Sequence, residues 1–245
     1  MTFDLTSWGI SLLKTPSERD LQTRVGASDL SQMCTRCLAD ALLALKSDAM
    51  ESNFWLSPRI GTGIHLLIEQ RAPEHGAIGE HRVVLGELPG YGPVKSTLDL
   101  YIVDENMVVD AKSTTRKKLA AYKRVLLEDD PSESLIPHRL TVNTYLNQLM
   151  LYGKGAQDEG YTVESVGILF ICRDGAADND VWGWPVPFDR ERADAVWARA
   201  AKLWAWLDLG HDPDELNRAP GCYTCTHLRP KASRGKLYLN LEEGA

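Results

Sequence analysis

Two aspartates and a lysine near the middle of the sequence have the types and spacing best suited to catalysis. Asp99 lies in one apolar run, and Asp110-Ala111-Lys112 closes the next. Both runs are rich in β-forming residues and a short polar turn separates them, so we expect adjacent strands that bring Asp99 and Asp110 side by side. Side chains alternate along a strand, which places Lys112 on the same face as Asp110.

This trio predicts metal-assisted phosphodiester hydrolysis. Paired carboxylates on rigid strands are oxygen ligands of the kind that Mg²⁺ and Mn²⁺ prefer. Such a metal polarises a phosphate and generates hydroxide, while the Lys112 ammonium orients the water or offsets developing charge. Short patterns of this kind also arise by chance as surface charges, so the interpretation needs support from the rest of the chain.

Four of the five cysteines form two pairs, Cys34-Thr-Arg-Cys37 and Cys222-Tyr-Thr-Cys225, near opposite ends of the chain. Two C-x-x-C pairs in a chain without a secretory signal indicate a metal site in preference to disulfides. Four thiolates satisfy either an iron–sulfur cluster or a tetrahedral zinc ion, and the spacing alone leaves both open. The alternative is two pairs of buried thiols.

A basic segment follows Lys112 in a chain whose net charge is −7. Because the overall charge repels nucleic acid, any contact with DNA must be local. We interpret the segment as a surface that contacts successive DNA phosphates and guides the DNA to the metal site. The alternative is a solvated helix face. Its candidate DNA-binding residues are Arg116, Lys117, Lys118, Lys123 and Arg124.

The elements that must position these residues follow from the hydrophobic periodicity. Helices are expected at 28–46, from Pro58 to Pro73, over the basic segment, and at 137–157 and 189–209. Strands are expected at 81–88, 96–103, 107–112, 163–172 and 181–186. The second helix carries His65 and, one turn later, Glu69, which is a candidate supporting acid.

The composition fits one globular domain over residues 1–245. The chain is 44% hydrophobic and 25% charged, and it shows no repeat or linker that would divide it. No apolar run approaches the roughly 18 residues of a membrane span, and the N-terminus lacks the features of a secretory signal. We therefore expect a soluble, cytoplasmic protein without membrane contact.

Taken together and in order, these pieces resemble the PD-(D/E)XK nuclease superfamily and, within it, the RecB-like, CRISPR-associated iron–sulfur exonuclease family. The resemblance spans Val25 to Pro230 and adds two motifs, Gly61-Thr-Gly-Ile-His65 and Gln148-Leu-Met-Leu-Tyr152. It implies an α/β fold of the restriction-endonuclease type, with a central mixed sheet flanked by helices. This sequence departs from the family in lacking the motif proline before Asp99 and in having Asp110 where glutamate is commoner.

The resemblance also implies roles for the site residues. Mg²⁺ or Mn²⁺ would be held by His65, Asp99, Asp110 and the backbone carbonyl of Ala111. Lys112 would position the attacking water, and Gln148 and Tyr152 would support Lys112 or the scissile phosphate.

A 4Fe-4S cluster is implied by the resemblance alone. The family holds it with one N-terminal and three C-terminal cysteines, but here the third C-terminal cysteine is missing and Cys37 is the expected substitute. Zinc remains the alternative. Either metal would form a clasp between residues 25–50 and 215–230, so that metal binding contributes to folding free energy.

The function expected from this resemblance is a metal-dependent DNA exonuclease acting on single strands or ends, in recombination, replication or repair. No G-x-x-x-x-G-K-[ST] motif is present, so unwinding would need a helicase partner, and a role beside CRISPR adaptation partners is also consistent. The rivals are a non-catalytic DNA-binding or assembly subunit that keeps the nuclease fold, and a zinc-stabilised endonuclease.

Overall fold

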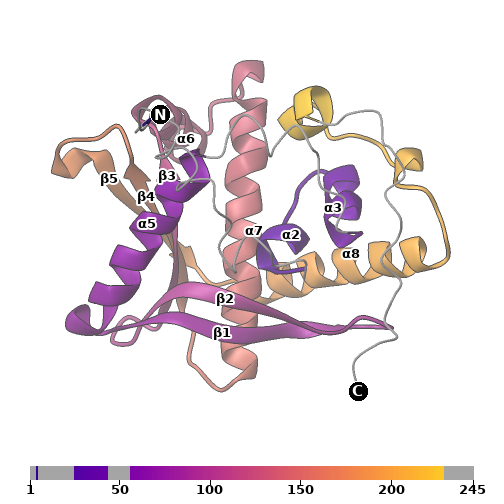
Figure 1. Ribbon diagram of the computed structural model, residues 1–245, viewed down its shortest axis with the longest axis horizontal. Coiled ribbons are helices and arrows are strands. Elements are labelled where there is room, and N and C mark those ends of the chain that lie inside the picture. Colours follow the sequence, from indigo (N-terminus) through magenta and orange to yellow (C-terminus); the bar gives the residue numbers. More distant parts are fainter. Residues whose placement is uncertain (1–3, 5–24, 44–55, 229–245) are drawn as a thin grey trace.

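The computed structural model describes residues 4, 25–43 and 56–228 (Figure 1). The end of the predicted helix 28–46, and residues 44–50 and 229–230 of the predicted clasp, lie outside the described residues. The helices of four or more residues are α2 (Ala27–Leu30), α3 (Thr35–Leu42), α5 (Leu56–Arg71), α6 (Arg116–Leu127), α7 (Ile136–Asp158) and α8 (Arg190–Asp208), with a 3₁₀ turn at Ala72–His75 and a π-helical turn at Thr224–Leu228. Short 3₁₀ turns cover Glu133–Leu135, Asp178–Asp180 and Pro213–Glu215.

The described residues form one five-stranded mixed sheet in the order β1-β2-β3-β4-β5. Its strands are β1 (Ala77–Leu88), β2 (Gly92–Ile102), β3 (Met107–Thr114), β4 (Ser165–Cys172) and β5 (Val181–Pro187). Neighbouring strands are antiparallel except β3 and β4, which are parallel. A parallel pair needs a crossover connection, and here α6 and α7 provide it. The mixed sheet with flanking helices confirms the expected α/β fold class.

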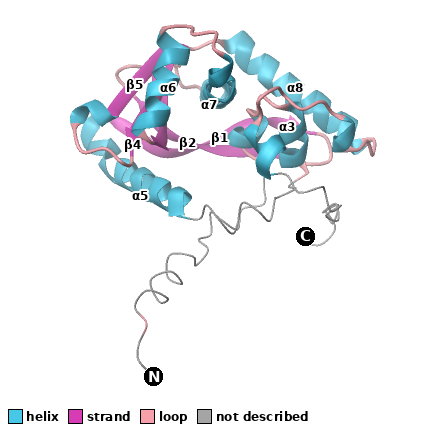
Figure 2. Ribbon diagram, turned by 90° about the horizontal axis from the view of Figure 1, so that it is seen from above, coloured by secondary structure: helices cyan, strands magenta, loops and turns pink. Residues whose placement is uncertain are grey.

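Helices cover the sheet from both sides. Figure 2 shows α5 on one side and α6, α7 and α8 on the other, and Figure 1 shows α7 crossing the middle of the molecule. The larger core lies on the α7 side and includes the fully buried Phe170, Leu149 and Leu151. Each such side chain stabilises the fold by about 1.5–3 kcal/mol through removal of apolar surface from water. A smaller cluster packs Ile68 of α5 against Leu100 and Val109.

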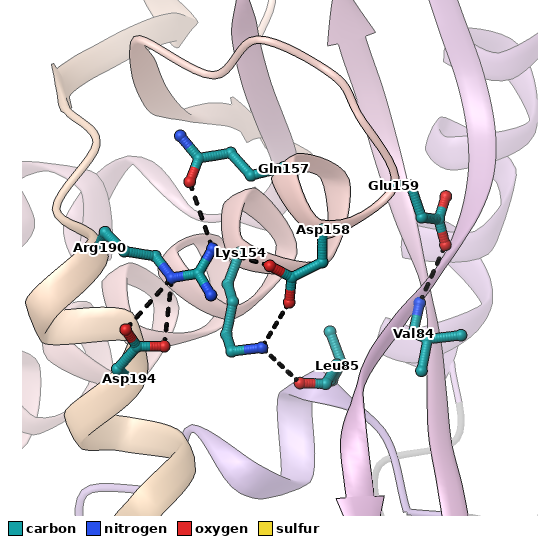
Figure 3. Close-up of polar contacts among 8 residues, drawn as sticks. All are labelled: Val84, Leu85, Lys154, Gln157, Asp158, Glu159, Arg190 and Asp194. Carbon is teal, nitrogen blue, oxygen red and sulfur yellow. Dashed lines mark hydrogen bonds and ion pairs between the residues drawn. The ribbon is translucent and has the colours of Figure 1, made fainter.

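Polar contacts fix the C-terminal end of α7 against β1 and α8 (Figure 3). The buried Lys154 donates to the Leu85 carbonyl at 3.1 Å and to Asp158 at 2.6 Å. Arg190 of α8 donates to Asp158 at 2.8 Å. A buried ammonium is costly unless its hydrogen bonds are satisfied, so these contacts define the position of α7 over the sheet.

The first predicted helix is divided in the structure, which corrects the expectation of one continuous helix carrying both N-terminal cysteines. α2 ends at Leu30 and α3 begins at Thr35, with Cys34 as the N-cap residue in an extended conformation (φ −78°, ψ 117°). Contacts with α7 hold the break: the Met33 N–H donates to Thr144 Oγ1 at 3.4 Å. The tertiary contacts therefore override the local helical periodicity.

The other predicted elements are present with small shifts of their ends. Within the described residues, no helix is long and apolar enough to cross a membrane.

Candidate active site

Three neighbouring strands bring carboxylates into one row. The β2–β3 pairing ends at Leu100 and Val109, so Asp99 and Asp110 are the next residues to face each other. The β1–β2 register likewise places Glu80 opposite Asp99. Residues opposite each other in adjacent strands lie on the same face of a sheet. The acidic groups therefore share one face.

Both oxygens of Asp99 are held by neighbouring groups. Its Oδ2 accepts a hydrogen bond from the Ala111 backbone N–H at 2.8 Å. Its Oδ1 lies 3.2 Å from Nδ1 of His65, which α5 supplies. The hydrogen bond to Asp99 raises the pKa of His65, although burial opposes this shift. The Asp99 carboxylate is thus fixed in orientation within a site where it is 5% exposed.

Asp110 and Lys112 form an ion pair on β3, in which the carboxylate is buried and the lysine side chain is partly exposed. Lys112 Nζ lies 2.7 Å from the buried Oδ2 of Asp110. Burial raises the pKa of Asp110 to about 6; the nearby Asp99 charge acts in the same direction, while Lys112 opposes it. Burial acts to lower the pKa of Lys112, but the charge and the hydrogen bond of Asp110, together with the nearby Tyr152 and Asp99, outweigh it and the pKa is raised.

Helix α7 supplies the groups around the ammonium of Lys112. Its Nζ donates to Gln148 Oε1 at 3.1 Å, and Gln148 Nε2 donates to the Tyr152 hydroxyl at 2.9 Å. The same ammonium lies 4.9 Å from the ring centroid of Tyr145, a cation–π distance. Burial raises the pKa of Tyr152 to about 12, so its hydroxyl stays protonated at neutral pH. The structure therefore connects Gln148 and Tyr152 to Lys112.

Glu80 is a site residue that sequence reasoning missed. Its side chain offers an oxygen within 4.8 Å of ligand atoms of both His65 and Asp99. Its φ of 49° lies in the left-handed region, which costs a non-glycine residue of order 1 kcal/mol or more. The neighbouring Gly79 lets α5 approach β1, because a Cβ there would lie 3.3 Å from Glu69 Cα. Nothing in the local sequence marks Glu80; only the cross-strand register does.

Glu69, the supporting acid suggested by the sequence, is exposed and lies outside this group among the described residues. Its position one turn from His65 indicated a shared helix face, but strand β1 supplies the acid instead.

The donor set fits a divalent cation. The His65 imidazole and one carboxylate oxygen each from Glu80 and Asp99 lie within 4.8 Å of one another. Asp110 lies outside that group but faces Asp99 in the β2–β3 register. Carboxylate oxygens suit Mg²⁺ and Mn²⁺, and an imidazole nitrogen suits transition-metal ions. Burial and, to a smaller extent, the charge of Asp99 raise the pKa of Asp110, and a bound cation would offset both effects.

The predicted DNA-binding residues divide into two groups. Arg116 donates to both carboxylate oxygens of Asp180 at 2.6 Å, and Arg124 pairs with Asp130. Lys117 and Lys118 are exposed on the first turn of α6. Lys123 lies 5.1 Å from a ring centroid of Trp182. The two arginines therefore contribute to internal ion pairs.

Cys34, Cys37, Cys222 and Cys225 meet in one buried group, which we term the cysteine clasp. All four are free thiols, and their sulfur atoms lie within 4.8 Å of one another. A hydrogen bond with Cys37 is the main cause that lowers the pKa of Cys34, to about 4, while burial raises that of Cys225 to about 12. The clasp joins the N-terminal and C-terminal parts, as the fold expectation required.

No protein-family model and no curated protein matches this sequence. Solved structures give weak similarity. SSO0001 shares 14% identity over 84% of this chain and 88% of its own, with a TM-score of 0.47. A phage related exonuclease from Haemophilus somnus 129PT shares 12% over 79% and 99%, with a TM-score of 0.44. LHK-Exo, an alkaline exonuclease from Laribacter hongkongensis, shares 12% over 84% and 93%, with a TM-score of 0.42. At these values the site must be interpreted from its own geometry.

Proposed function

We propose that this protein is a metal-dependent deoxyribonuclease. The observation that carries the proposal is that the contact between His65 and Asp99 lies beside the ion pair of the buried Asp110 with Lys112, and that Lys112 also donates to Gln148. A structural ion pair alone does not need a histidine and further carboxylates beside it. Ionisable groups whose pKa values are shifted by burial and by neighbouring charges are typical of catalytic sites.

His65, Asp99, Asp110 and the Ala111 carbonyl would hold Mg²⁺ or Mn²⁺, with Glu80 as an additional oxygen donor. When bound, such an ion supplies Lewis-acid polarisation of the phosphate and a lowered pKa of water. The Ala111 N–H fixes the Asp99 carboxylate, so the ligand does not have to reorganise on binding.

The chain's own residues supply the remaining chemistry. Lys112 is held between Asp110 and Gln148, where its ammonium orients the attacking water and offsets charge that develops on the phosphate. Tyr152 accepts from Gln148 and thereby fixes the amide that accepts from Lys112. The exposed Lys117 and Lys118 would contact DNA phosphates, which supply most of the sequence-independent affinity.

We further propose, on the basis of the resemblance, that the enzyme is an exonuclease on single strands or DNA ends and that a helicase or recombination partner supplies unwound DNA. The alternatives predict different products. A zinc-stabilised endonuclease cuts circular single-stranded DNA, whereas a strict exonuclease leaves it intact. A non-catalytic DNA-binding subunit cleaves neither form.

The direct test compares wild type with Lys112→Ala on end-labelled and circular single-stranded DNA in Mg²⁺ or Mn²⁺. Lys95→Ala is the matched control, because Lys95 is exposed on β2. The proposal requires metal-dependent cleavage in wild type and in the control, and its loss in Lys112→Ala with folding preserved by circular dichroism. Absence of cleavage by wild type on every DNA form would overturn it in favour of the binding subunit.

A further inference from the structure

The metal centres that four thiolates can hold require different distances between the sulfur atoms, so the distances in the cysteine clasp distinguish them. Cys37 Sγ lies 3.3 Å from Cys225 Sγ and 3.5 Å from Cys222 Sγ. Cys34 Sγ lies 3.6 Å from Cys225 Sγ. No pair among the four exceeds 4.8 Å.

A single tetrahedral ion requires separations of this size. With Zn–S bonds of about 2.3 Å, the sulfur atoms at the corners of the tetrahedron lie about 3.8 Å apart. The three measured distances fall within about 0.5 Å of that value. The thiolates already surround a volume that fits one ion.

A four-iron cluster requires a larger arrangement. Each thiolate binds a different iron and points outward from its corner of the cube, so thiolate sulfurs lie roughly 6 Å apart. A two-iron cluster also separates the thiolates on one iron from those on the other. Every sulfur pair of the clasp is closer than the cubane separation.

From these distances we infer that the cysteine clasp binds one zinc ion and not the 4Fe-4S cluster that the resemblance implies. Tetrahedral all-thiolate coordination is the usual form of structural zinc, and two C-x-x-C pairs supply it.

The local backbone holds the thiolates at this spacing. Cys34 caps α3 and Cys37 lies in its first turn, so both point toward the same helix end. On the other side, the Thr226 N–H donates to the Cys222 carbonyl at 3.1 Å and the Cys222 N–H donates to the Ala219 carbonyl at 3.1 Å. The Ala219 N–H also donates to Cys34 Sγ at 3.4 Å, a supporting contact of the kind that orients metal ligands. Moving Cys34 away from the C-terminal segment would break the Ala219–Cys34 contact.

The clasp supports helix α7. Leu140 of α7 packs against the four cysteines. The segment just before Cys34 contacts α7 again, because Asn147 Nδ2 donates to the Ser31 carbonyl at 3.4 Å. The next residue, Gln148, is the one that accepts from Lys112. Zinc would therefore hold the N-terminal segment against the helix that supports the proposed catalytic lysine.

The test is the metal content of wild-type protein, purified without oxygen from cells supplied with both iron and zinc. We expect a colourless protein with one zinc per chain and no inorganic sulfide. Replacement by Co²⁺ should give the intense visible bands of tetrahedral thiolate coordination. About four irons with inorganic sulfide per chain, a single iron without sulfide, or the absence of any bound metal would each overturn the inference.

Two variants localise the ion. Cys222→Ser should lose zinc, whereas Cys172→Ala, which removes the buried cysteine of β4 outside the clasp, should retain it. Cys222→Ser is not required to fold, because the wild-type measurement alone decides the identity of the metal. The result does not depend on nuclease activity, so failure of this inference and failure of the proposed function are separate outcomes.

Discussion

The Asp99 carboxylate accepts a hydrogen bond from the Ala111 backbone N–H at 2.8 Å, just beyond the last residue pair of β2 and β3. A side chain thus continues the contact between two strands at the point where their backbone pairing ends. This contact fixes one carboxylate oxygen and leaves the other directed at His65. This hydrogen bond therefore fixes the orientation of Asp99, one of the proposed metal ligands.

We predict that Asp99→Asn abolishes metal-dependent cleavage while the fold is retained. The amide oxygen can still accept from the Ala111 N–H, and only the charged contact with His65 is lost. The free energy of unfolding should therefore fall by only about 1–2 kcal/mol, the value of one hydrogen bond. The loss of a charged ligand should lower the cleavage rate by at least about 100-fold. Calorimetric titration with Mn²⁺ should show the accompanying loss of metal affinity. Unchanged Mn²⁺ affinity would exclude Asp99 as a ligand.

Glu80→Gln should weaken Mn²⁺ binding by about tenfold or more, because it removes an anionic donor beside His65 and Asp99. Glu69→Gln is the matched control, since Glu69 has the same side chain and lies near the same helix–strand contact but is exposed. Equal affinities of the two variants would show that Glu80 does not contact the ion. Titration by calorimetry provides the comparison.

Gln148→Ala should reduce kcat by about tenfold, the equivalent of one hydrogen bond to a charged group. Lys112 would keep its ion pair with Asp110 but lose the acceptor that fixes its direction. Tyr152→Phe should have a smaller effect, because it removes only the partner of Gln148. Single-turnover rates at saturating DNA measure the difference. A larger loss in Tyr152→Phe would contradict this order and indicate direct contact of the hydroxyl with DNA.

Substitutions at different positions of the basic helix α6 should affect either DNA binding or stability. Lys117→Ala with Lys118→Ala should weaken DNA binding and lower the slope of log affinity against log salt by about 2. Arg116→Ala should instead lower the melting temperature, because it leaves the largely buried Asp180 without its bidentate partner. Fluorescence anisotropy over a salt series and thermal melts distinguish the two effects. An unchanged melting temperature in Arg116→Ala would show that the ion pair contributes little.

Asp158 should contribute a pH-dependent part of the stability. Burial acts to raise its pKa, but hydrogen bonds from Lys154 and Arg190 outweigh burial and the pKa is lowered. The stabilisation is therefore present above the unfolded-state pKa of about 3.9 and is lost as pH falls through the lower folded-state value.

Asp158→Asn should accordingly destabilise the protein at pH 7, and the difference from wild type should shrink below about pH 3.9. Urea unfolding across this range measures it, with Asp104→Asn in the exposed β2–β3 turn as control. A difference that stays constant on acidification would rule out the contribution of the Asp158 charge.

Local patterns predicted most of the secondary structure because apolar periodicity reports which face of each element is buried. The same reasoning missed the break between α2 and α3, where contacts of Met33 and Ser31 with α7 stop the helix. It also did not show that Arg116 is paired with Asp180, 64 residues away. Each of these features depends on partners that are distant in the sequence.

Residue types and their spacing were enough to predict the chemical groups of the site: two carboxylates and a lysine on neighbouring strands, a histidine upstream, and two cysteine pairs. Which acid joins His65, and how far apart the cysteine sulfurs lie, depends on how the elements pack. Glu80 reaches the site through the β1–β2 register and a left-handed backbone, and the clasp spacing follows from packing of α3 against the C-terminal segment. Residue type is a local property, but coordination distance depends on how separate elements pack, and packing involves the whole chain.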